Sequence, residues 1–101
     1  MGYKFQMQDA ERAKEVRTAA QELFDKYRPA NRYELGITLP PEHCPSPIRN
    51  MQPNWIGISH DRVHIEFGNG FEHHGLNCFP NGVVGEGDAK IIDGLWFVSE
   101  R

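Results

Sequence analysis

Apolar residues spaced three and four positions apart mark the first part of the chain as a helix. They form one stripe that consists of Ala10, Ala13, Val16, Ala20, Leu23, Phe24 and Tyr27. This spacing is typical of an amphipathic helix that lays one face on a core. Asp9 is a good N-cap residue, and Pro29 keeps Arg28 out of the α region. The pattern therefore predicts a helix over about residues 9–27.

Beyond the helix, the pattern changes to alternation and to short apolar runs, which are typical of strands. We predict strands over about residues 34–39, 54–59, 62–67, 71–79 and 89–98. The last of these is apolar on both faces, which favours a central position, and Gly94 inside it indicates a bulge or a close approach by another backbone. The proline-rich stretch between the first two strands predicts an irregular connection.

These elements fit one α+β domain over residues 1–101. In it, one N-terminal amphipathic helix packs on an antiparallel sheet of four or five strands. The formal net charge of −3 and the lack of a basic run argue against a nucleic-acid partner and against docking on an anionic membrane. With no apolar stretch of membrane-spanning length and no signal-peptide pattern, we expect a cytoplasmic protein with free thiols at Cys44 and Cys78.

Ligand chemistry is concentrated around one turn signal, Gly68-Asn69-Gly70. A hairpin with a three-residue loop there pairs Phe67 with Phe71 and places four polar side chains on one face. They are His64, Glu66, Glu72 and His74. A two-residue loop would shift the pairing by one position and mix these polar side chains with apolar ones. We favour the three-residue loop because it separates the two kinds of side chain.

In this register Glu66 faces Glu72, and like charges that oppose each other across strands are destabilising. A cation would offset that repulsion, and two imidazoles with two carboxylates suit Zn²⁺ or Fe²⁺. The alternative is an exposed polar face that binds nothing. The glycine-rich stretch Gly82–Asp88 lacks the Lys and Ser/Thr of a phosphate-binding loop and is interpreted as a plain loop.

The leading functional hypothesis is a small soluble binding or protein-interaction domain without evident catalytic activity. A free sheet edge could pair with a protein partner or with a second copy of the chain. Trp55 at a strand start and His43 in the proline-rich stretch are candidate binding-surface residues. Trp55 in particular could help a sheet face take a peptide or a sugar. The alternative hypothesis is a divalent-metal protein, such as a metal-dependent hydrolase, that uses the His/Glu cluster.

Overall fold

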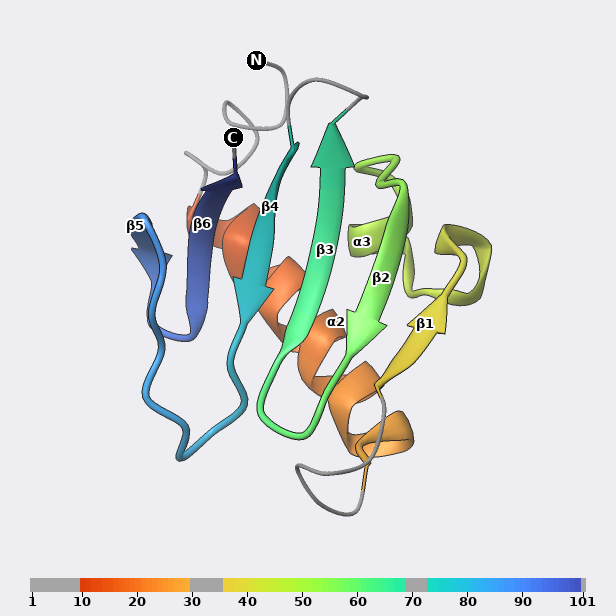
Figure 1. Ribbon diagram of the computed structural model, residues 1–101, viewed down its shortest axis with the longest axis horizontal. Helices are drawn as coiled ribbons and strands as arrows, with labels where there is room; N and C mark the ends of the chain where they lie inside the picture. Colours follow the sequence, from red (N-terminus) through yellow and green to blue (C-terminus); the bar gives the residue numbers. More distant parts are fainter. Residues whose placement is uncertain (1–9, 30–35, 69–72, 101) are drawn as a thin grey trace.

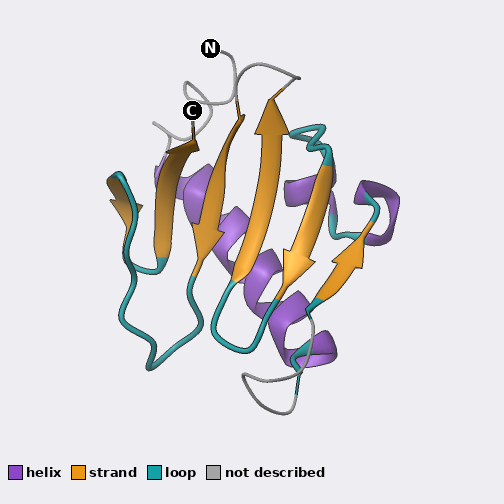
Figure 2. Cartoon of the chain, viewed as in Figure 1, coloured by secondary structure: helices purple, strands orange, loops and turns teal. Residues whose placement is uncertain are grey.

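The computed structural model describes residues 10–29, 36–68 and 73–100. One long helix, α2 (Ala10–Tyr27), lies behind an antiparallel sheet of six strands (Figures 1 and 2). The strands are β1 (Ile37–Leu39), β2 (Trp55–Ile58), β3 (Val63–Gly68), β4 (His73–Cys78), β5 (Ala89–Ile92) and β6 (Leu95–Glu100). Their order across the sheet is β1-β2-β3-β4-β6-β5. The predicted α+β class is therefore confirmed, with six strands in place of four or five.

Helix α2 follows the predicted amphipathic pattern closely. Its buried residues are Ala13, Val16, Ala19, Ala20, Leu23 and Phe24. Ala10 belongs to the predicted stripe but is exposed, whereas Ala19 lies outside the stripe and is buried. The helix ends at Tyr27, ahead of Pro29, as the sequence predicts. Asp9, the predicted N-cap residue, lies outside the described residues.

The segment predicted as one long final strand is in fact a hairpin. Ile92 pairs with Leu95, so Asp93 and Gly94 form a two-residue turn between β5 and β6. Gly94 has a φ of +83°, which glycine adopts without steric cost. Asp-Gly is a strong signal for such a turn, which the interpretation of Gly94 as a bulge missed. The alternative, a close approach by another backbone, is confirmed, because an added Cβ at Gly94 would be 3.0 Å from the Phe79 carbonyl oxygen. The hairpin makes β5 an edge strand and accounts for the additional strand.

The proline-rich connection is more regular than predicted. It holds a 3-10 turn, η1 (Pro41–His43), and a single helical turn, α3 (Ser46–Arg49). Cys44, Ile48 and Met51 are buried and belong to the same core cluster as α2 and the sheet. The connection is therefore anchored by its apolar residues, which the spacing of its prolines does not reveal.

Helices α2 and α3 lie on the same face of the sheet, and the side chains of that face form the core (Figure 1). Ile56, Ile58, Val63, Ile65, Leu76 and Leu95 are almost completely buried there. Among the described residues, no helix covers the opposite face, which we call the open face. The helices that the structure describes are too short or too polar to cross a membrane.

Candidate functional site

The pairing of β3 with β4 decides which polar side chains share the open face. His64 pairs with Asn77, Glu66 with Gly75, and Gly68 with His73. Both registers considered from the sequence are therefore wrong. The favoured one paired Phe67 with Phe71, whereas Phe67 pairs with His74 in the structure.

Burial of apolar side chains explains the observed register. It directs Leu76 and Cys78 to the core face, where their exposed fractions are 1% and 3%. The predicted register would have turned both of them outward and buried Gly75 and Asn77 in their place. The predicted register was chosen from the residues close to the turn, where it separated polar from apolar side chains. It did not take into account Leu76 and Cys78 farther along the strand, where burial stabilises the sheet most.

This register divides the four residues predicted to bind a metal. His64 and Glu66 lie on the open face, as expected. His74 points to the core face, where its ring stacks between Phe67 and Phe97 at centroid distances of 6.3 and 6.4 Å. Burial there lowers the pKa of His74. Glu72 lies outside the described residues.

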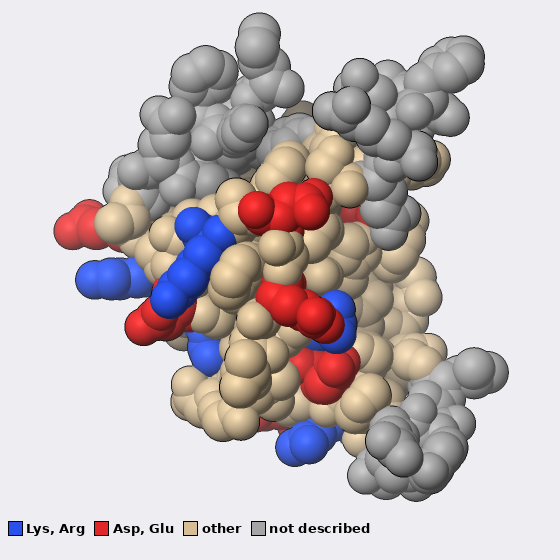
Figure 3. All heavy atoms as spheres, turned by 60° about the vertical axis from the view of Figure 1, so that its left-hand side comes forward, with Lys and Arg blue, Asp and Glu red and all other residues tan. Residues whose placement is uncertain are grey.

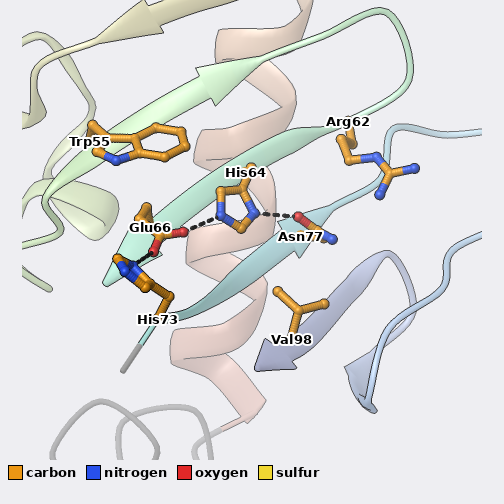
Figure 4. A pocket seen from close by; sticks show the side chains of 7 residues that line it. All are labelled: Trp55, Arg62, His64, Glu66, His73, Asn77 and Val98. Carbon is orange, nitrogen blue, oxygen red and sulfur yellow. Dashed lines mark hydrogen bonds and ion pairs between the residues drawn. The ribbon is translucent and has the colours of Figure 1, made fainter. Parts of the chain in front are cut away.

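In place of the predicted set, the open face holds a chain of four hydrogen-bonding side chains (Figure 4). His64 Nδ1 lies 2.6 Å from Asn77 Oδ1, and His64 Nε2 lies 2.6 Å from Glu66 Oε1. The other carboxylate oxygen, Glu66 Oε2, lies 3.2 Å from His73 Nδ1. The Glu66 side chain is 9% exposed, compared with 54% for His73. A nearly buried carboxylate is thus held between two imidazoles.

The geometry at His64 constrains its protons. Carboxylate oxygens and amide oxygens accept hydrogen bonds, so both ring nitrogens of His64 must donate. If the Asn77 amide is turned over, its nitrogen donates to His64 Nδ1 and a neutral imidazole completes the same network.

These side chains line a hollow of about 500 Å³ together with Trp55, Arg62 and Val98. Two strand glycines provide its space. The Trp55 ring lies over Gly57, where an added Cβ would be 3.1 Å from Cζ3 of the indole. At Gly75 a Cβ would meet both the His64 ring and the backbone carbonyl of Ile65. Without side chains at these positions, the two rings can lie close to the sheet and the centre of the open face is hollowed.

Arg62 borders the hollow and has its own acidic partners. Its guanidinium lies 3.2 Å from Asp61 and 3.5 Å from Glu86, and its centre is 4.9 Å from the Phe79 ring. Hydrogen bonds from Arg62 hold the pKa of the Asp61 carboxyl below its usual range. In Figure 4, Arg62 lies beyond Asn77, away from Glu66. Its charge is therefore compensated outside the hydrogen-bonded chain.

The glycine-rich stretch has a structural role at the neighbouring part of the sheet. Gly85 and Gly87 approach the Trp96 side chain so closely that an added Cβ would collide with it. Trp96 is thereby partly covered, whereas Trp55 is 41% exposed. Of the two tryptophans, Trp55 is the one that lines the hollow and presents an aromatic ring to solvent.

Of the two residues predicted for a binding surface, Trp55 lines the hollow and His43 does not. Sequence reasoning missed Arg62, His73 and Asn77. A prediction that buried Leu76 and Cys78 would have identified His73 and Asn77, because alternation along β4 then places both on the open face. Within residues 10–29, 36–68 and 73–100, no group of three or more His, Cys, Asp or Glu side chains is arranged to hold a metal ion.

Comparison of the chain with protein-family models, with curated proteins and with solved structures found no match. Function must therefore be inferred from the chemistry of the open face.

Proposed function

We propose that this chain is a binding module and that the hollow on the open face is its ligand site. The observation that supports this proposal is a partly exposed tryptophan beside a nearly buried, hydrogen-bonded carboxylate. Trp55 is 41% exposed, and Glu66 is 7% exposed between His64 and His73. Concave sites that combine an aromatic surface with a few converging polar groups are typical of ligand binding.

The glycines beneath the rings add to this argument. Glycine inside a strand is unfavourable because it loses more conformational freedom on folding than other residues. Gly57 and Gly75 both lie in strands, directly below the rings of Trp55 and His64. At Gly75 the nearby carbonyl of Ile65 already requires a glycine, whereas at Gly57 an added Cβ would meet only the Trp55 ring. The glycine at position 57 therefore favours a site that requires the hollow.

The open face is a better candidate than the sheet edges, which the sequence had suggested as pairing surfaces. The edge strands β1 and β5 have 3 and 4 residues. Pro40 follows β1 directly, and β5 has an irregular register near Lys90. Short, proline-flanked or irregular edges are the usual protection against strand pairing.

The proposal is tested with ¹⁵N-labelled protein and a panel of defined small molecules that contains saccharides, nucleosides, amines and carboxylates. We expect at least one class to shift the backbone amides of Gly57, His64 and Gly75 in two-dimensional NMR spectra. Trp55→Ala should abolish these shifts. Val84→Ala is the matched control, because Val84 is 92% exposed and lies outside the hollow. If no class shifts these amides, the proposed site is wrong.

A divalent cation is the second candidate, favoured by the proximity of two imidazoles to the Glu66 carboxylate. His64 Nε2 and Glu66 Oε1 are 2.6 Å apart and share a hydrogen bond, so a metal ion would need these two side chains to move apart. The ligands would be His64, Glu66 and His73. A zinc-dependent rise in melting temperature that EDTA reverses and His64→Ala removes would support it. Metal-free protein with unchanged melting in zinc would contradict it.

A further inference from the structure

We infer that the ligand of the open-face hollow is a neutral saccharide of one or two rings. This inference rests on the binding function proposed above and adds the chemical class of the ligand. Three properties of the hollow lead to it: charged side chains that already have partners, an exposed aromatic ring, and planar hydrogen-bonding groups that are spread over an area.

The carboxylate and the guanidinium of the hollow already have partners, which disfavours strongly ionic ligands. Glu66 is hydrogen-bonded to His64 and His73, and Arg62 forms ion pairs with Asp61 and Glu86. An anion would need Arg62 to exchange its carboxylate partners, and a cation would compete with imidazoles for Glu66. Figure 3 shows acidic and basic side chains interspersed over the side of the molecule that carries β5 and β6, without a large area of one sign. A neutral ligand would neither have to displace the carboxylate partners of Arg62 nor compete with the imidazoles for Glu66.

Trp55 provides a surface for the apolar side of such a ligand. Its indole lies over Gly57 and is inclined by 49° to the His64 ring, with 5.5 Å between the centroids. The π-face of an indole is electron-rich and attracts positively polarised hydrogens. The C–H groups on one side of a pyranose ring are such hydrogens, so a sugar can pack on Trp55 and keep its hydroxyl groups directed elsewhere.

Hydrogen-bonding groups are available for those hydroxyls. The amide nitrogen of Asn77 has no hydrogen-bond partner among the described residues, and each Glu66 oxygen retains a lone pair after accepting from one imidazole. His73 is half exposed and offers its second ring nitrogen. These groups come from β3 and β4 and are spread over the floor of the hollow (Figure 4). A nucleobase forms hydrogen bonds along one edge, whereas a sugar forms them all around its ring, so the arrangement favours the sugar.

The inference is tested with three probes that share one ring: N-acetylglucosamine, glucosamine, which adds a cationic amine, and glucuronate, which adds a carboxylate. Glucose, galactose, mannose and their disaccharides complete the panel. Binding to the wild-type protein is followed by NMR shifts at Gly57 and Gly75 and by the change in tryptophan fluorescence. We expect a neutral member to bind about tenfold more tightly than the charged members. Trp55→Ala should weaken that binding by about tenfold or more, a loss of roughly 1.4 kcal/mol or more.

Two conservative variants address the polar groups. Glu66→Gln and Asn77→Asp keep the shape of each side chain, and each should weaken saccharide binding, whereas Val84→Ala should leave it unchanged. If nucleosides, amines or carboxylates shift the hollow and saccharides do not, the saccharide inference is wrong and the proposed binding function stands. If saccharides bind but the shifts lie elsewhere or survive Trp55→Ala, the inference is also overturned. If no compound of any class reaches the hollow, both proposals fail.

Discussion

Gly75 and Gly57 of the open face should respond differently to the addition of one methyl group. At Gly75 the new Cβ would collide with the backbone carbonyl of Ile65 and lie 2.9 Å from Cε1 of the His64 ring. The carbonyl belongs to a paired strand and cannot move freely, so the collision is costly. At Gly57 the new Cβ would be 3.1 Å from the Trp55 ring, which is partly exposed and can tilt away.

The magnitudes follow from these contacts. Overpacking of this kind costs about 1–3 kcal/mol. Displacing His64 also weakens its hydrogen bonds to Asn77 and Glu66, each worth about 1 kcal/mol. We therefore expect Gly75→Ala to lower the free energy of unfolding by about 3 kcal/mol. Gly57→Ala should stay within about 1 kcal/mol of wild type, because alanine restricts the unfolded chain more than glycine does.

Urea denaturation followed by circular dichroism measures both variants on one scale. The loss at Gly75 corresponds to a fall in melting temperature of roughly 4–8 °C per kcal/mol for a domain of this size. A double-mutant cycle with His64→Ala separates the two contributions, because removing the ring leaves only the collision with Ile65. If Gly75→Ala is as stable as Gly57→Ala, His64 does not lie against Gly75 and the register of β3 with β4 is wrong.

Three further predictions concern the core face of the sheet. Ile48→Ala should lower the free energy of unfolding by about 2–5 kcal/mol in urea denaturation, because Ile48 is 0% exposed. Ile37→Ala, at a position that is 37% exposed, should lower it by less than about 1 kcal/mol, and equal losses would contradict the anchoring of α3. Burial lowers the pKa of His74, so the unfolded chain binds the proton more readily than the folded one. The contribution of His74 to the free energy of unfolding should therefore be complete above its ordinary pKa of about 6.5 and fall as the pH drops through the folded pKa. His74→Phe should reduce this pH dependence in melting curves. Complete burial raises the pKa of Cys78 to about 12. Alkylation of this thiol at pH 8 should therefore require unfolding and become faster as urea is added. Rapid alkylation in native buffer would disprove its burial.

Local patterns were sufficient for the helix and for much of the sheet. The apolar stripe of α2 and the proline beyond Tyr27 defined an element whose bounds match the structure closely. Most strands were located because alternation and glycine signals are local properties. The hairpin of β5 and β6 was also encoded locally in Asp93-Gly94, but the long apolar run around that turn was interpreted as one strand.

The sequence by itself determined that His64 and Glu66 share a face, because they are two positions apart in one strand. Only the tertiary structure decided which residues of β4 join them. A shift by an odd number of positions exchanges every side chain of β4 between core and solvent, and the choice depends on how much apolar surface the helix and sheet bury together. Burial of Leu76 and Cys78 placed His73 beside Glu66 and Asn77 beside His64, and it turned His74 to the core face.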